Sequence, residues 1–158
     1  MKNMNSKILD DVSAKYQAKF PNLANSKDLL AKAQTQFKKR KKPKIIVKQK
    51  QLKNSKDYKC KSIQKAFKLK NRKNLTPYDC SIMLTGGPLI SDDGYLYFLP
   101  RLLEHVLEDP IHEDLLNSRL KRLDDRNLSS DETAIIEKIK ILADEIRAYS
   151  DMLKTKNC

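Results

Sequence analysis

The sequence has no tryptophan, only three glycines and only three cysteines in 158 residues. These scarcities exclude collagen-like chains and disulfide frameworks. No run of 18 apolar residues occurs, so we expect no membrane span. The first 20 residues lack an apolar core and include Asp10 and Asp11, so we expect neither a signal peptide nor a transit peptide. Reduced thiols and a cytoplasmic location are therefore expected.

The motifs of common catalytic and cofactor sites are also missing. Neither G-x-G-x-x-G nor G-x-x-x-x-G-K-[ST] occurs, and the Gly86-Gly87 pair is followed by Pro88, which has no amide to offer a phosphate. The two histidines, His105 and His112, have no H-E-x-x-H or C-x-x-C pattern around them. The sequence therefore predicts no catalytic residue, no metal site and no cofactor, and we expect a protein that is not an enzyme.

Charge is distributed very unevenly along the chain. The formal net charge is +13. Residues 38–73, called here the basic segment, hold 17 lysines and arginines against one acidic residue, Asp57. Residues 74–158 hold 16 acidic residues against ten basic ones. Because a general bias toward lysine would raise its frequency everywhere, the basic segment is a local feature with a cause of its own.

This density of positive charge indicates a polyanion-binding surface. The contacts are expected mainly with nucleic-acid backbone, because no zinc finger, RNP motif or clear helix-turn-helix is present. Two aromatic residues of the segment, Tyr58 and Phe67, are candidates for base stacking or, alternatively, for anchoring a small core. The predicted polyanion-binding residues are lysines and arginines of the basic segment: Lys38, Lys39, Arg40, Lys41, Lys42, Lys44, Lys48, Lys50, Lys61, Lys65, Lys68, Lys70, Arg72 and Lys73.

The basic segment is also compatible with two roles that involve no nucleic acid. One is docking onto an acidic protein, as a cytosolic immunity or antagonist module that masks an acidic surface would do. The second is a solvated arm, or one that folds against the net acidic C-terminal half of its own chain. Carboxylates that covered the lysines would remove the basis for nucleic-acid binding.

Apolar periodicity predicts a mainly α-helical protein, a small helical bundle with a basic, partly extended connector. Pro100 is expected near a helix start, because proline breaks a helix interior. Residues 44–53 are ambiguous between a strand and an extended segment. The helices are expected over 5–20 (ended by Pro21), from Asn25 or Ser26 to about Lys42 (ended by Pro43), 57–70, from Pro77 to Thr85, from about Leu99 to Glu108, and 111–123. In these helices the apolar side is expected to include Ala66, Leu69, Tyr78 and Ile111.

The last helix has the clearest signals. Ser129 and Glu132 have the spacing of a capping box. A seven-residue seam follows, formed by Ile135, Ile139, Leu142, Ile146, Tyr149 and Leu153. Residues 131–154 are expected either to pack inside the bundle or to form a homodimeric coiled coil. The chain is divided into N-terminal helices (1–37), a basic connector (38–74) and a helical core domain (75–158).

Residues 75–104 contain a leucine-threonine-helix segment, an acidic turn and then the motif Y-F-L-P-R-L-L-E. This stretch, about a fifth of the chain, resembles a group of small uncharacterised bacterial proteins with the same order of segments. The matching residues are Leu75, Thr76, Asp79, Tyr97, Phe98, Leu99, Pro100, Arg101, Leu102, Leu103 and Glu104. The resemblance implies a cytosolic bacterial origin and no particular activity. Many of those proteins have two cysteines before this stretch, whereas this chain has only Cys60 there, so it implies no metal site.

Arg101 lies inside that motif. Its spacing predicts an ion pair with Glu104 or Glu108 or, alternatively, a contact with a ligand.

Overall fold

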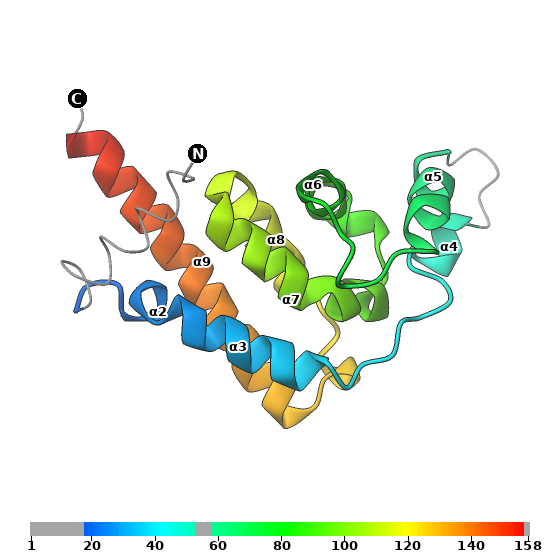
Figure 1. Cartoon of the computed structure of the whole chain (residues 1–158), viewed down its shortest axis with the longest axis horizontal. Coiled ribbons are helices and arrows are strands. Elements are labelled where there is room, and N and C mark those ends of the chain that lie inside the picture. The colour runs from blue at the N-terminus through cyan, green and yellow to red at the C-terminus, as the bar shows by residue number, and fades with distance from the viewer. Residues whose placement is uncertain (1–17, 53–57, 157–158) are drawn as a thin grey trace.

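The computed structural model describes residues 18–52 and 58–156, and it is mainly α-helical, as predicted (Figure 1). The helix expected over 5–20 lies almost entirely outside these ranges, and residues 18–20 form a turn. In chain order the described elements are α2 (Pro21–Ala24), α3 (Ser26–Phe37), α4 (Gln49–Leu52), α5 (Tyr58–Phe67), α6 (Pro77–Thr85), the 3-10 helix η1 (Gly87–Leu89), α7 (Asp92–Glu108), η2 (Pro110–His112), α8 (Glu113–Leu120), η3 (Asp125–Asn127) and α9 (Ser130–Lys156).

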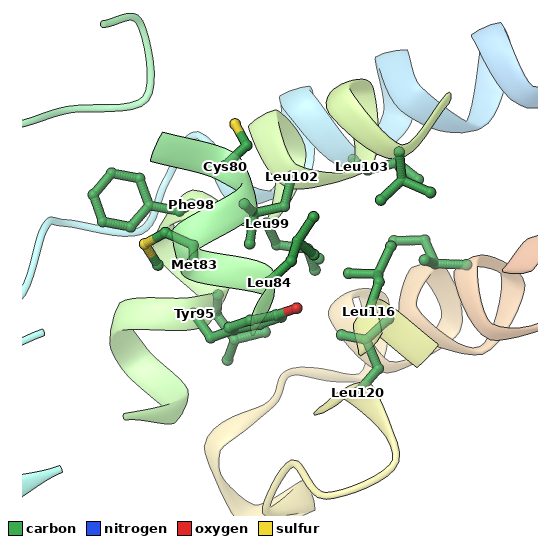
Figure 2. Packing of buried hydrophobic residues seen from close by; sticks show 14 of the residues in the cluster. Cys80, Met83, Leu84, Tyr95, Phe98, Leu99, Leu102, Leu103, Leu116 and Leu120 are labelled. Atoms are coloured by element: carbon green, nitrogen blue, oxygen red, sulfur yellow. The ribbon is translucent and has the colours of Figure 1, made fainter. Parts of the chain in front are cut away.

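The bundle is built around α7, which packs against α3, α6 and α8, while α9 packs against α2, α3 and α8 (Figure 1). Figure 2 shows the centre of the core, where Leu99 and Leu102 of α7 meet Leu84 of α6. Leu116 and Leu120 of α8 line the other side of this view. Each fully buried side chain of this size stabilises the fold by about 1.5–3 kcal/mol. In the described ranges, no helix combines the length and apolar composition needed to cross a bilayer.

The start and the seam of α9 follow the prediction. The Ser129 hydroxyl accepts the Glu132 amide at 3.1 Å, and the Glu132 carboxylate accepts the Ser129 amide at 3.0 Å. Ile139, Ile146 and Tyr149 of the seam are buried within this one chain. The intramolecular alternative is therefore confirmed. A homodimeric coiled coil through residues 131–154 has no support, because the seam is already covered.

The predicted helix start at about Leu99 is wrong, because α7 continues through Pro100. Its true start is Asp92, where the Ser91 hydroxyl caps the helix by accepting the Gly94 amide at 3.0 Å. Pro100 has no N–H to donate to the Leu96 carbonyl, a loss that costs roughly 3 kcal/mol in a helix interior. Burial of both neighbouring turns of α7 offsets that cost.

Several predicted ends and faces also differ from the structure. Pro21 begins α2 at its first position rather than ending a helix, a place where its missing N–H is harmless. α3 ends at Phe37 and not at Lys42, because the five consecutive cations that follow continue as turn and coil. Residues predicted on apolar faces point instead to solvent: Ala66, Leu69, Tyr78 and Ile111.

One buried cluster draws on all three predicted segments. Ala33 and Phe37 come from the N-terminal residues, and Ile46 and Val47 come from the basic connector. The part of the connector around Ile46 and Val47 is therefore extended and anchored, and Val47 forms an isolated antiparallel bridge with Ile90. Its neighbour Gln49–Leu52, expected as a strand or an extended segment, is instead the short helix α4, and α5 follows within the same connector.

The backbone of the connector at Ile46 and Val47 is anchored by uncharged groups. The Gln64 amide oxygen accepts the Ile46 amide at 2.7 Å and the Val47 amide at 3.2 Å. The Ile46 carbonyl accepts the Ser91 amide and hydroxyl, both at 2.9 Å. A Cβ at Gly94 would lie 2.6 Å from this same carbonyl, so glycine is what lets the connector reach the first turn of α7.

His105 is a buried residue of α7, 4% exposed, and neither ring nitrogen has a hydrogen-bond partner in the described structure. Burial, followed by the charges of Arg101 and His112, lowers its pKa below the ordinary 6.5. Asp109 and Glu108 act in the opposite direction. The folded state therefore favours neutral His105, whereas the unfolded chain takes up a proton near the ordinary value.

We expect the free energy of unfolding to decrease as pH falls below about 6.5, because the unfolded chain then binds the His105 proton first. Urea unfolding between about pH 7 and pH 5 measures this loss. His105→Gln, which carries no titrating group, is expected to lose less stability over the same interval. All other groups that titrate in this pH interval are present in both the unaltered chain and the variant, so the difference between them reports on His105. Equal losses would contradict this role of His105.

Candidate polyanion-binding surface

The lysines of the basic segment form an extensive exposed surface. They lie on the coil after α3, on α4, on α5 and on the loop that follows α5. The exposed lysines are Lys38, Lys39, Lys41, Lys44, Lys48, Lys50, Lys59, Lys61, Lys65, Lys68 and Lys73. Lys59 is an addition to the predicted set, although it lies within the same run of cations.

α5 has one apolar side and one cationic side. Cys60, Ile63 and Phe67 are buried, so the residues at the remaining positions face solvent. Tyr58, Lys61, Lys65 and Lys68 follow each other at three- and four-residue spacing and therefore share one side, called here the α5 lysine face. Tyr58 is 77% exposed at its beginning.

The prediction that Phe67 stacks on bases is wrong. Its side chain is fully buried and meets Phe98 of α7 edge to face, with ring centroids 6.1 Å apart. The alternative interpretation, a core anchor, is confirmed for this residue. Tyr58 keeps the exposure that stacking on an unpaired base requires.

Arg40 is an internal connector rather than part of the binding surface. Its guanidinium binds Glu132 through Nε at 2.5 Å and through Nη2 at 3.0 Å, and it also donates to the Asn127 carbonyl at 2.6 Å. Burial alone would raise the pKa of Glu132, but hydrogen bonds from Arg40 and Ser129 outweigh it and lower the pKa. Arg40 thus joins the basic segment to the capped start of α9, with its charge already compensated.

Arg72 is also committed to the fold. Its Nη2 donates to the carbonyls of Phe37 and Arg40, and its Nε donates to the Tyr97 carbonyl at 2.6 Å. The guanidinium lies 4.2 Å from the centroid of the Tyr97 ring. Arg72 therefore caps the C-terminus of α3 and joins it to α7.

Two lysines of the predicted set also have internal partners. Lys70 pairs with Asp79 at 2.5 Å, and Asp79 closes the capping box at the start of α6. Burial alone would raise the pKa of Asp79, yet the hydrogen bonds from Lys70 and Thr76 lower it. Lys42 donates to the Lys68 carbonyl at 2.6 Å. The predicted binding role is therefore corrected for three residues, Arg40, Lys70 and Arg72. Lys42 keeps its charge and two further N–H donors, so its binding role stays a prediction.

The remaining cations are not covered by the acidic half of the chain. Arg40 and Lys70 are paired with carboxylates. Among the residues that the structure describes, carboxylate partners are absent for Lys38, Lys39, Lys41, Lys44, Lys48, Lys50, Lys59, Lys65, Lys68 and Lys73.

One group of acidic residues lies away from the basic segment. Glu113 and Asp114 of α8 lie beside Asp144 and Asp151 of α9. Burial, followed by the charges of these carboxylates, raises the pKa of Glu113, while Arg147 acts in the opposite direction. Figure 1 shows α4 and α5 at the opposite end of the molecule from the last turns of α9. The exposed lysines of α4 and α5 therefore lie away from this group of carboxylates, which favours attraction of a polyanion to them.

A cleft of about 620 Å³ lies beside the lysine surface. Its walls come from the end of α3, the loop after α5 and the middle of α7, and its lining residues are Gln34, Lys38, Arg72, Lys73, Leu75, Pro100, Arg101 and Glu104. Arg101 donates to the Leu75 carbonyl at 3.2 Å and to Glu104 at 3.0 Å, which confirms the predicted pair with Glu104. Gln34 and Leu75 were not predicted as site residues, because only tertiary packing brings them to these cations.

Cys80 lacks the properties of a reactive thiol. Cys80 is buried, and burial raises its pKa to about 11, so it is a neutral thiol at pH 7. Across residues 18–52 and 58–156, no cluster of three or more His, Cys, Asp or Glu side chains is placed to hold a metal ion.

Neighbouring residues Arg72 and Lys73 provide a matched test of internal and surface cations. We expect Arg72→Met to lower the free energy of unfolding by about 2–4 kcal/mol, because several buried carbonyls lose their donor. Lys73→Met removes the same charge from an exposed position and should change it by less than about 0.5 kcal/mol. Urea unfolding of both variants measures the difference, and equal effects would contradict the assignment.

Comparison with known proteins adds no relative from which a function can be transferred: no protein-family model, no curated protein and no solved structure matches this chain. The resemblance of residues 75–104 to small bacterial proteins stays a prediction. What the chain binds is therefore inferred from the charge and geometry of its own surface.

Proposed function

We propose that this protein binds nucleic-acid backbone, without reading base sequence, through the exposed lysines of the basic segment. The observation that carries the proposal is the set of exposed lysines without a described carboxylate partner at one end of the molecule. Lysine ammonium groups bind phosphates as point charges and release condensed counterions when they do so. The affinity then depends on the number of phosphates contacted rather than on the sequence.

The α5 lysine face lies on a helix that is anchored in the core. Lys65 and Lys68 project from a helix that Ile63 and Phe67 anchor in the core, so their positions are fixed relative to the rest of the fold. Lysines held on a rigid element lose less conformational entropy on binding than lysines of a flexible arm. This face is therefore expected to contribute more affinity per charge than an unanchored lysine run.

Single strands are the favoured form of nucleic acid. An exposed aromatic residue among cations is the arrangement by which proteins stack unpaired bases while lysines follow the backbone. Tyr58 occupies such a position, 77% exposed on the same side of α5 as Lys61 and Lys65. Duplex DNA presents no unstacked base to this ring, so its binding would depend on charge alone.

The charge contribution is tested with a pair of double variants in the full chain. Lys65→Gln combined with Lys68→Gln is expected to weaken binding of fluorescent single-stranded RNA by about fivefold to tenfold at roughly 50 mM salt. The same variant should reduce the slope of log affinity against log salt by about one to two. Lys121→Gln combined with Lys154→Gln removes equal charge from the acidic half and should change the affinity less than about twofold.

Fluorescence anisotropy at several salt concentrations between roughly 50 and 200 mM gives both quantities. Absence of RNA and DNA binding at the lowest salt would contradict the proposal. So would equal losses in the two double variants, since they would show that net charge alone determines binding. A single acidic protein that co-purifies in stoichiometric amount, with no nucleic-acid binding, would instead support the protein-docking alternative.

The stacking contribution has its own matched pair. Tyr58→Ala should weaken single-stranded RNA binding by about fivefold, because stacking on one base contributes about 1 kcal/mol. Duplex DNA binding should change little. Tyr78→Ala removes a tyrosine of similar exposure, 74%, from α6 and serves as the control. Equal effects of Tyr58→Ala on single strands and duplexes, measured by anisotropy, would contradict stacking.

A further inference from the structure

The cleft lined by Lys38, Lys73 and Arg101 has features that the exposed lysine surface lacks. Three separate parts of the chain form it, and hydrogen bonds between them hold its shape. Arg72 binds the carbonyls at the end of α3, and Arg101 binds the Leu75 carbonyl at 3.2 Å. Leu75 and Pro100, both buried, provide apolar wall. The site is therefore a fixed concavity rather than a flat charged patch.

Four cations line the cleft. All nitrogens of Arg72 bind backbone carbonyls, whereas the other three cations keep N–H donors for a ligand. The bonds of Arg72 to Tyr97, Phe37, Lys38 and Arg40 engage all three of its nitrogens. Lys38 and Lys73 are exposed, and the described structure gives their ammonium groups no acceptor.

Arg101 keeps part of its donor capacity. A guanidinium has five N–H donors. The described bonds of Arg101 use Nε for the Leu75 carbonyl and Nη1 for Glu104. Its Nη2 amino group therefore remains for a ligand, and the two bonds already formed fix the orientation of the guanidinium.

A phosphomonoester matches this set of groups better than a phosphodiester does. Besides Arg72, two lysines and one arginine line this cleft. Together they favour a group that carries about two negative charges near pH 7, as a phosphomonoester does because its second pKa is about 6. A phosphodiester inside a strand carries one. The Glu104 carboxylate, held at 3.0 Å from Arg101, offers an acceptor for hydroxyl groups beside the phosphate. The volume, about 620 Å³, lies in the range of small-ligand sites.

We propose that the cleft between α3, the loop after α5 and α7 binds a phosphomonoester carried on a hydroxylated body, the chemistry shared by a mononucleotide and by the 5′-terminal nucleotide of a strand. The phosphate contacts Lys38, Lys73 and Arg101 Nη2. Glu104 accepts a sugar hydroxyl, and the body packs on Leu75 and Pro100. This site goes beyond the proposed backbone binding, because it recognises a terminal group and does not include the α5 lysine face.

The test titrates the full chain with adenosine 5′-monophosphate, adenosine and inorganic phosphate by calorimetry. The monophosphate is expected to bind with a dissociation constant of about 1 mM or lower, and adenosine at least tenfold more weakly. Lys38→Gln combined with Lys73→Gln should weaken the monophosphate at least fivefold. Lys65→Gln combined with Lys68→Gln, on the α5 lysine face, should leave it unchanged. A shift of the Arg101 side-chain NMR signal on binding places the phosphate in the cleft.

A second arm distinguishes the two sources of the phosphomonoester. A tetranucleotide with a 5′-phosphate is compared with the same strand ending in a 5′-hydroxyl. Tighter binding of the phosphorylated strand, lost in Lys38→Gln with Lys73→Gln, assigns the site to strand ends. Monophosphate binding without that difference assigns it to free nucleotides, and either result supports the site.

Failure of this site is separable from failure of the proposed function. Absence of saturable binding of the monophosphate up to about 10 mM would overturn the site. Equal weakening by the Lys65→Gln, Lys68→Gln control would also overturn it, since binding would then be diffuse. Neither result affects long-strand binding through the α5 lysine face, which the anisotropy experiment measures independently.

Discussion

The arrangement of α3 and α7 depends on the guanidinium of Arg72, which separates carbonyl oxygens that would otherwise face one another. The end of α3 and the middle of α7 both present carbonyl oxygens to the same point, those of Phe37 and Tyr97 among them. Acceptors cannot satisfy one another, and a helix C-terminus carries partial negative charge. A group with five donors and no acceptor is what this point requires, and its flat face also lies 4.2 Å from the Tyr97 ring.

Arginine and lysine have different roles in this chain although each carries one positive charge, because their donor geometries differ. Arg40 and Arg119 repeat the pattern of Arg72. Arg119 donates to the carbonyls of Gly87 and Ile90 and to Asp92, and it is buried. A planar fork can bind several carbonyls at once, whereas an ammonium is a strongly hydrated point charge that stays in water. Most of the lysines consequently remain at the surface, where a partner can reach them.

The sequence predicted the features that local chemistry determines and missed those that tertiary packing determines. The capping box of Ser129 and Glu132 depends on side chains three residues apart, so the sequence shows it directly. The passage of α7 through Pro100 depends on burial that only the assembled bundle provides. Tyr58 and Phe67 have similar lysine-rich neighbours, and only the face of α5 that meets the core separates them. The cleft unites Lys38, Arg72 and Arg101, which no spacing rule connects.

The way in which the connector is anchored explains why its charge survives folding. Its buried backbone is held by the amide of Gln64, by Ser91 and by the close approach at Gly94, all uncharged. Carboxylates in those places would satisfy the same amides, but they would also neutralise nearby lysines and add a buried charge to be compensated. An anchor of neutral groups avoids both effects. Around Ile46 and Val47 the chain thereby fixes the connector to its core without neutralising the neighbouring lysines, whereas Arg40 and Lys70 elsewhere in the segment pair with carboxylates. Exposed lysines on an anchored backbone are the physical requirement for a rigid polyanion-binding surface.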